Sequence, residues 1–388
     1  MVAVMKIAVV QPKFNTGGGA ERYALNLSQG LSRRGHDLHL FGRKARHLPD
    51  GVCFHRIWAL AAGRALKTWS FARSAQWRVA RGNFAIVHGS GKTYCQNVHR
   101  LGGGLHRTYL QKMGKPANAW YDRVALALEE RLMRAITLKA IICPSRWVQE
   151  DLLRVYPGVA GIVHVITNGV DLDAFAYCPD PQRRRDLRWA LPDAARTPVL
   201  LFVAANFWLK GLDRAIALMP HLPDTVLMVI GGDHPQPFMD QARGLGVAER
   251  VRFMGAQTNM AACYQAADLL LHPTRFDPVA NVCLEALACG TPVVTTARAG
   301  TADLLHDGRG GAVMDPAAGA EPAARLIREL LSWGVKGRRQ ARQLVADHSH
   351  EAHLDHIEAL YRRITDPYQG AAANDHHATQ GIGRNEGL

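Results

Sequence analysis

Short apolar runs rich in Val, Ile and Leu recur along the chain, and segments with helical periodicity separate them. The first set of runs is Ile7–Val10, Asp37–Phe41, Ala85–Val87, Ala140–Cys143 and His164–Ile166. A second set follows a break: Val199–Ala204, Val226–Ile230, Val251–Phe253, Leu269–Leu271 and Pro292–Thr295. Strands that alternate with helices in this way are typical of parallel sheets. The pattern predicts an α/β protein with two Rossmann-like domains.

The break is polar and rich in proline, with Pro179, Pro181 and a basic run at 183–185. Such a stretch is typical of a linker. We therefore expect an N-terminal domain over residues 1–175 and a C-terminal domain over 176–366. A final helix is expected near Glu351–Ile364, followed by a flexible tail over 367–388.

Composition narrows the class of protein. A chain of 388 residues with 48% hydrophobic side chains can build two to three domain cores. Its 7 cysteines contain no Cys-x-x-Cys pair, which excludes a disulfide framework and fits a reducing cytosol. The only apolar N-terminal stretch contains Lys6, and no run of about 18 uncharged apolar residues occurs anywhere. We expect a cytoplasmic protein whose membrane contact, if it has any, is peripheral.

The net charge of +14 is unevenly distributed. Residues 1–150 carry 24 Lys and Arg against 7 Asp and Glu, whereas residues 151–388 carry 23 against 26. Residues 51–100 hold eight basic and no acidic side chains, together with several tryptophans. This combination indicates an anionic partner.

Residues 57–81, written as a helix, place Trp58, Leu66, Trp69 and Trp77 in one broad sector and most Arg and Lys outside it. Three interpretations stay open. The helix either packs its tryptophans on the domain and leaves its basic side solvated, or it contacts an anionic membrane surface. Nucleic acid is a third, weaker possibility, because no nucleic-acid-binding motif occurs.

Two segments have the residue types that bind nucleotide ligands. Thr16-Gly17-Gly18-Gly19-Ala20-Glu21 follows the first strand and opens a helix, where backbone N–H groups approach phosphate closely. Asp277 and Glu285 stand eight positions apart, just after the strand Leu269–Leu271. In a doubly wound sheet, ligands bind at the carboxyl ends of strands. Glu285 also lies among apolar neighbours, where a carboxylate without a ligand would be unfavourable.

Four motifs together resemble one enzyme family. They are Gly18-Gly19-Ala20-Glu21, Asn168-Gly169-Val170-Asp171, Lys210-Gly211, and the acid, seven residues, then Glu-Ala-Leu-Ala-Cys-Gly-Thr-Pro-Val-Val that begins at Asp277. In these residues the chain resembles family 4 (group 1) of the retaining glycosyltransferases from residue 6 to about 365. Within the family, the likeness is greatest to bacterial lipopolysaccharide-core glucosyltransferases.

The resemblance implies a GT-B fold, in which two Rossmann-like domains face a cleft and the C-terminal helix crosses back to the first domain. It also implies the site residues. Glu285 would bind the ribose, Lys210 would neutralise the diphosphate, and Asp277 would contact the sugar. Further donor-binding residues would be Gly18, Gly19, Asn168, Asn206, Ala280, Asn281 and Val282. No metal or other cofactor is expected, since the nucleotide sugar is a co-substrate.

Three positions depart from the family pattern. Asp277 replaces the usual Glu, and Ala280 stands where glycine is usual. Ala205 takes the place of an Arg that commonly accompanies the lysine, so Asn206 or Arg275 would have to compensate.

The acceptor side offers three histidines as groups that could face the reacting sugar. His106 follows Gly102-Gly103-Gly104 in a loop where similar sequences carry a glycine-flanked histidine, and it is our first choice. His99 and His88 are the alternatives. The cluster His348, His350, His353 and His356 has spacings that could hold a metal, but a solvated helix start explains it better.

These observations predict a cytoplasmic hexosyltransferase that uses a nucleotide sugar, UDP-glucose or a similar donor. Its acceptor would be an anionic glycolipid or glycan at a membrane, such as the lipopolysaccharide core, and no nucleic acid is expected as a partner. Retention would proceed by same-face attack or through a covalent intermediate, and we favour the first. The alternatives are a nucleotide-sugar epimerase on the same scaffold and a catalytically silent nucleotide-binding protein.

Overall fold

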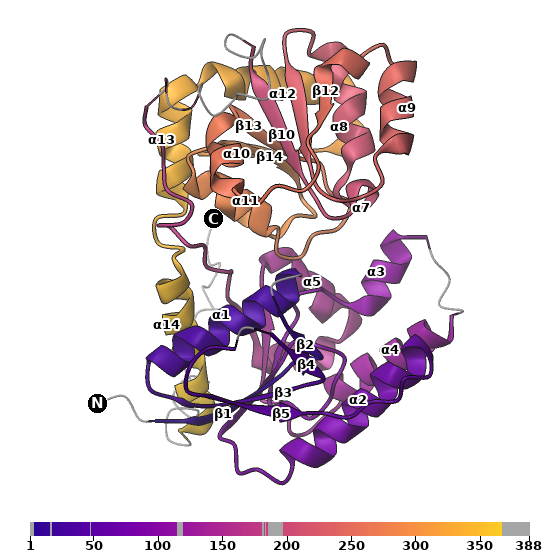
Figure 1. The fold of residues 1–388 in the computed structure, drawn as a ribbon, viewed down its shortest axis with the longest axis vertical. Coiled ribbons are helices and arrows are strands. Elements are labelled where there is room, and N and C mark those ends of the chain that lie inside the picture. The colour runs from indigo at the N-terminus through magenta and orange to yellow at the C-terminus, as the bar shows by residue number, and fades with distance from the viewer. Residues whose placement is uncertain are drawn as a thin grey trace, which may run out of the picture.

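The computed structural model describes residues 4–366, apart from 16–17, 47, 115–118, 181, 183 and 185–196. Its strands form two large parallel sheets, one in each lobe of Figure 1. The first sheet has the order β5 (Val52–Arg56), β3 (Asp37–Gly42), β1 (Lys6–Val10), β6 (Ile86–Gly89), β7 (Val98–Arg100), β8 (Ala140–Cys143) and β9 (Val163–Val165). The second has the order β12 (Val251–Phe253), β11 (Val226–Ile230), β10 (Val199–Val203), β13 (Leu269–His272), β14 (Val293–Thr296) and β15 (Gly311–Met314). A small parallel pair, β2 (Lys13–Phe14) and β4 (Lys44–Ala45), lies beside the first sheet.

The prediction of an α/β protein with two Rossmann-like domains is confirmed. All ten predicted strands occur within two residues of their expected bounds, because strands covered on both faces are almost continuously apolar. In the two large sheets the pattern missed β5, β7 and β15, and it also missed the short strands β2 and β4. β5 is a half-exposed edge strand, β7 contains His99 and Arg100, and β15 begins at a glycine.

Helices connect the strands. In the first lobe they are α1 (Gly19–Arg33), α2 (Gly63–Val79), α3 (His106–Lys112), α4 (Trp120–Met133) and α5 (Arg146–Val155). In the second they are α7 (Phe207–Lys210), α8 (Leu212–Leu218), α9 (Gln236–Gly244), α10 (Met260–Ala266), α11 (Asn281–Ala288), α12 (Ala320–Ser332) and α13 (Gly334–Leu344).

The last helix, α14 (His350–Thr365), leaves the second lobe and packs along the first, as the yellow ribbon in Figure 1 shows. Its apolar side, including Leu354 and Tyr361, joins the core formed by α1 and β1. Gly30 of α1 permits this approach, because a Cβ there would lie 2.3 Å from Leu354. The predicted crossing of the C-terminal helix is confirmed. The predicted tail, 367–388, lies outside the described residues.

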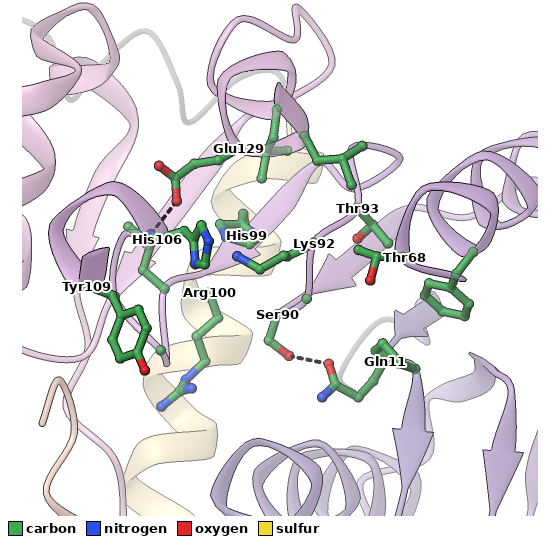
Figure 2. A pocket seen from close by; sticks show the side chains of 18 of the residues that line it. Gln11, Thr68, Ser90, Lys92, Thr93, His99, Arg100, His106, Tyr109 and Glu129 are labelled. Atoms are coloured by element: carbon green, nitrogen blue, oxygen red, sulfur yellow. Dashed lines mark hydrogen bonds between the residues drawn. The ribbon is translucent and has the colours of Figure 1, made fainter. Parts of the chain in front are cut away.

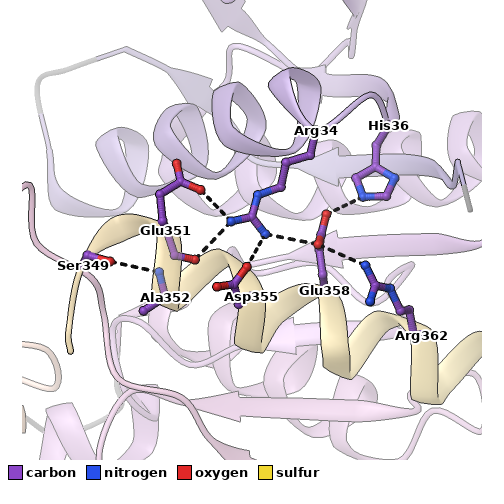
Figure 3. A network of polar contacts seen from close by, with 8 residues as sticks. All are labelled: Arg34, His36, Ser349, Glu351, Ala352, Asp355, Glu358 and Arg362. Atoms are coloured by element: carbon purple, nitrogen blue, oxygen red, sulfur yellow. Dashed lines mark hydrogen bonds and ion pairs between the residues drawn. The ribbon is translucent and has the colours of Figure 1, made fainter. Parts of the chain in front are cut away.

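Polar contacts fix the same helix (Figure 3). The Arg34 guanidinium of α1 pairs with Glu351 at 2.6 Å, Asp355 at 2.8 Å and Glu358 at 3.1 Å. His36 contacts the other oxygen of Glu358 at 2.7 Å. Side chains more than 300 residues apart in sequence therefore join α14 to the first lobe.

The tryptophans of the helix over 63–79 do not pack on the domain. The buried face of α2 consists of small residues with Phe71 and Val79, whereas Trp69 and Trp77 are 47% and 58% exposed. Trp58 precedes the helix and is 66% exposed. The interpretation in which these tryptophans pack on the domain is therefore wrong. Among the helices of the described ranges, none is both long and apolar enough to cross a membrane.

Candidate active site

Glu285 lies at the boundary of the two lobes. One turn into α11, its carboxylate accepts a hydrogen bond from the Tyr264 hydroxyl at 2.7 Å. Partial burial raises the pKa of Glu285 despite this bond. The residue lines a cavity of about 400 Å³ together with Gly19, Arg22 and Asn168. The glycine turn and Glu285, far apart in sequence, thus face one cavity.

The glycine turn places α1 against that cavity. Gly18 is the N-cap of α1 and Gly19 is its first residue. A Cβ on Gly18 would lie 2.4 Å from the Glu21 carboxylate, whereas the space at Gly19 is open. The backbone of Gly19 is therefore accessible from the cavity.

Lys210 and Asp277 form an ion pair at the start of the loop before α11. Lys210 Nζ lies 2.8 Å from Asp277 Oδ2, and His272 Nε2 lies 3.0 Å from the same oxygen. Burial alone would raise the pKa of Asp277, but the Lys210 ammonium and the His272 ring hold it well below its usual range. Asp277 Oδ1 accepts from the Ala280 N–H at 3.0 Å. Asp277 is therefore ionised, with both of its oxygens bonded.

Ala280 has a left-handed backbone, with φ 54° and ψ 51°. It is the one non-glycine residue of the described ranges with a positive φ. This explains the glycine that is usual in the family. The conformation turns the chain into α11, so that Asn281 and Val282 supply its first N–H groups. For neither N–H is an acceptor present among the described residues.

Both proposed substitutes for the absent family arginine are engaged elsewhere. Asn206 caps α7 by accepting from the Leu209 N–H at 2.8 Å. Arg275 makes a two-bond pair with Asp213, at 2.7 and 2.6 Å, and lies over the Trp208 ring. Lys210 is thus left without a free cation beside it in these segments.

Asn168 connects the two lobes. Its amide nitrogen donates to Asn281 Oδ1 at 2.9 Å, and its amide oxygen accepts from the Arg100 guanidinium. The neighbouring Gly169 leaves no room for a side chain, since a Cβ would lie 2.5 Å from the Ser349 carbonyl oxygen. The predicted motif at 168–171 therefore joins the first sheet, the start of α11 and the chain entering α14.

The first lobe holds a second cavity, of about 390 Å³, in which His106 lies (Figure 2). His106 is the first residue of α3, and its Nε2 lies 2.9 Å from Asp122 Oδ1. Its backbone N–H donates to Glu129 at 2.6 Å. Burial and the Lys92 ammonium lower the pKa of His106, although the Asp122 carboxylate opposes them. His106 is therefore neutral and fixed in orientation at neutral pH.

The other two histidines occupy different environments. His99 also lines this cavity, but it is buried and contacts Gln96, and desolvation lowers its pKa to about 4. His88 does not line it. Its Nδ1 contacts the Tyr361 hydroxyl of α14 at 2.7 Å, and burial lowers its pKa to about 3. This geometry makes His88 a core residue.

Several residues that surround the predicted site residues were not predicted from the sequence. Lys92, Asp122 and Glu129 surround His106, and Tyr264 and His272 bind the two predicted carboxylates. Lys92 and His272 have a sequence signal, because each follows a predicted strand at its carboxyl end. Of the C-terminal histidines, His353 bonds the Thr167 carbonyl, and no cluster of three metal-binding side chains occurs within the described ranges.

Two Rossmann-like lobes, a glycine turn that faces Glu285 across a cleft, and a C-terminal helix that returns to the first lobe define a GT-B glycosyltransferase. Solved structures agree with this fold. The lipopolysaccharide glycosyltransferase WaaG superimposes with a TM-score of 0.79 at 21% identity, over 92% of this chain and 99% of that one. HepE of Anabaena, solved with UDP-glucose, gives 0.71 at 18% identity, over 92% and 98%.

Sequence comparison identifies the family. The profile described as Glycosyltransferase Family 4 matches residues 17–174, and that of Glycosyl transferases group 1 matches 183–344. The chain belongs to the group 1 glycosyltransferases. It is 28% identical to D-inositol 3-phosphate glycosyltransferase of Xylanimonas cellulosilytica over 84% of this chain and 85% of that protein. It is 36% identical to the lipopolysaccharide glucosyltransferase WaaG of Escherichia coli K12 over 139 residues, which are 34% of this chain and 37% of WaaG.

Proposed function

We propose that this protein is a retaining hexosyltransferase that moves a sugar from a nucleotide sugar, UDP-glucose or a similar donor, to an anionic membrane glycan such as the lipopolysaccharide core. The observation that carries the proposal is the convergence of Gly19, Asn168 and Glu285 on one cavity between the lobes. The ribose would bind Glu285, and the diphosphate would lie at the free N–H groups of Asn281 and Val282. The UDP-glucose in HepE and the names of the relatives support this donor and acceptor class.

The charge of the reaction fits these groups. As the glycosidic bond breaks, negative charge develops on the departing diphosphate, and the Lys210 ammonium and the start of α11 would stabilise it. Lys210 would exchange part of its contact with Asp277 for the phosphate. His106 and Asp277 would contact the sugar from opposite lobes. No step requires a metal ion.

Retention without a covalent intermediate is consistent with the carboxylates present. A double displacement requires a carboxylate free to attack the anomeric carbon. Asp277 has both oxygens bonded, and the Glu129 oxygens accept from His106 N–H and the Tyr156 hydroxyl. Same-face attack is therefore the mechanism we favour. Membership of a glycosyltransferase family also favours transfer over the epimerase and silent-protein alternatives.

An anionic acceptor suits the cavity around His106. Among its lining side chains are Arg43, Lys67 and Lys92, opposed by the single carboxylate of Glu129. Lys92 makes no hydrogen bond or ion pair with a described residue, and desolvation lowers its pKa. A phosphate or carboxylate on the acceptor would restore a partner to it.

Membrane association would place the acceptor at this cavity. Trp69 and Trp77 of α2 and Trp120 of the adjacent α4 are exposed, and the basic side chains Arg64, Arg73 and Arg78 lie exposed on α2. Exposed tryptophans among basic residues suit an anionic lipid surface. We therefore propose peripheral binding on the cytoplasmic face of the membrane through α2 and α4.

The donor proposal is tested by calorimetric titration of UDP, GDP and ADP into the wild type and into Lys210→Ala. UDP binding that weakens in Lys210→Ala but not in the exposed control Lys336→Ala supports the site. Incubation with UDP-[¹³C]glucose and a lipopolysaccharide-core acceptor, followed by NMR of the anomeric carbon, tests transfer and retention. A well-folded wild type that binds no nucleotide would refute the proposal.

The membrane proposal is tested by sedimentation with vesicles that contain anionic lipid. The triple variant Arg64→Glu, Lys67→Glu, Arg78→Glu should lose binding. The control triple in the second lobe has the same change in net charge: Arg325→Glu, Lys336→Glu, Arg339→Glu. If both triple variants bind the vesicles as strongly as the wild type does, α2 is not a membrane-binding surface.

A further inference from the structure

Arg100 is a buried cation without an anion. It ends β7, its side chain is 2% exposed, and no carboxylate of the described residues pairs with it. The guanidinium lies 3.7 Å from the Tyr23 ring centroid and donates one hydrogen bond to the neutral amide of Asn168. Its Nε has no hydrogen-bond partner. A buried charge without a counter-charge is costly, so its retention indicates a ligand.

Its position lies between the two cavities. Arg100 lines the cavity that contains His106, and its partner Asn168 lines the cavity that contains Glu285. Figure 2 shows the guanidinium pointing away from His106 and Lys92. If the donor has its ribose at Glu285 and its sugar near His106, the diphosphate that links them must lie beside the contact between Arg100 and Asn168. Asn281, where α11 begins, is bonded to the same Asn168.

The second lobe supplies too little free positive charge for that diphosphate. Lys210 is paired with Asp277, Arg275 is paired with Asp213, and position 205 is alanine. UDP carries two to three negative charges at neutral pH. A second cation must therefore come from another element.

The loop after β7 is shaped around the guanidinium. A Cβ on Gly102 would lie 1.9 Å from Arg100 Nη1, which is a steric clash. Any larger residue at 102 would therefore displace the Arg100 side chain. Gly103, the next residue, has open space around it. The glycine at 102 is thus explained by the room that Arg100 needs.

We infer that Arg100 is the second cation for the donor diphosphate, supplied by the first lobe in place of the absent arginine at 205. The inference rests on the proposed nucleotide-sugar donor. In the transfer, the bond from the anomeric carbon to the diphosphate oxygen breaks and its electron pair stays on that oxygen. The acceptor oxygen bonds the same carbon, and its proton passes to the departing diphosphate. Arg100 supplies charge and hydrogen bonds to the diphosphate and exchanges no proton.

The test compares uridine with UDP, because the two ligands differ only in the diphosphate. Calorimetry should give a wild type that binds UDP much more tightly than uridine. In Arg100→Gln this ratio of affinities should fall about tenfold or more, with uridine affinity unchanged. The control is Arg131→Gln, which removes another arginine stacked on a tyrosine, 3.8 Å from the Tyr94 ring. It should leave the ratio as in the wild type.

Gly102→Ala is a second variant, which displaces the guanidinium but keeps the charge in the chain. It should reduce the same ratio, whereas Gly103→Ala should not. Equal losses of uridine and UDP affinity in Arg100→Gln would mean a purely structural role and overturn the inference. If wild type binds uridine and UDP equally, the inference is also wrong. If it binds neither, the donor proposal itself fails, and that result is distinguishable from the others.

Discussion

Replacement of Glu285 by glutamine should stabilise the protein and weaken its binding of nucleotide. Burial raises the pKa of this carboxyl on folding. In the unfolded chain the pKa is about 4.3, so at a pH just above this value the folded state binds more protons than the unfolded state. Stability therefore falls as pH rises through the raised pKa. Glutamine removes this cost and still accepts from Tyr264. We expect added stability at pH 7, with no gain below about pH 4.

Binding should change in the opposite direction. A carboxylate that accepts from ribose hydroxyls makes charged hydrogen bonds of about 1.5–3 kcal/mol, which corresponds to a loss of roughly ten- to hundredfold in UDP affinity. Urea denaturation and calorimetry on the same preparations measure both quantities. The matched control is Glu150→Gln on the exposed side of α5. A Glu285→Gln protein that is less stable and binds UDP like the wild type would refute the reasoning.

Three further predictions concern the first lobe. Asp122→Asn removes the anion at His106, so the pKa of His106 should fall further in an NMR titration. An unchanged titration would show that the contact carries no charge. His88, with its pKa lowered to about 3, binds a proton only when unfolded between about pH 3 and 6.5, so stability should fall as pH decreases through that range. His88→Gln should flatten this dependence in melting temperatures measured from pH 4 to 7, and an equal slope would contradict it. Gly104 has φ +65°, and a Cβ at this position would lie 2.8 Å from the second lobe. Gly104→Ala should therefore lower stability by about 1 kcal/mol and reduce kcat/KM. Gly103→Ala should behave like the wild type.

The sequence was sufficient for the features that depend on local patterns. Buried parallel strands are apolar throughout, so their positions were visible, and the spacing of Asp277 and Glu285 after one such strand located the second-lobe site. Contacts between distant residues left no such pattern. Tyr264 meets Glu285 only because α10 packs beside α11, and nothing about Lys92 in the sequence shows that it faces His106.

Arg100 illustrates why polar residues inside a fold escape prediction. A His-Arg pair is not expected in a buried strand, yet β7 is buried along its length and lies between β6 and β8 inside the sheet. Likewise, Asn206 and Arg275 were chosen by their nearness in sequence to Lys210. Their side chains bond within the second lobe instead, which sequence distance does not reveal.

The return of α14 has a consequence for biosynthesis. Most of the first lobe is translated before the second lobe, but part of its core, including Leu354 and Tyr361, is translated after it. Arg34 likewise cannot form its ion pairs until Glu351 and Asp355, more than 300 residues downstream, have been synthesised. The first lobe therefore cannot complete its packing until α14 has been synthesised, and its exposed apolar groove must be protected during that interval. A nascent chain released before residue 350 should depend on chaperones far more than one released after residue 366.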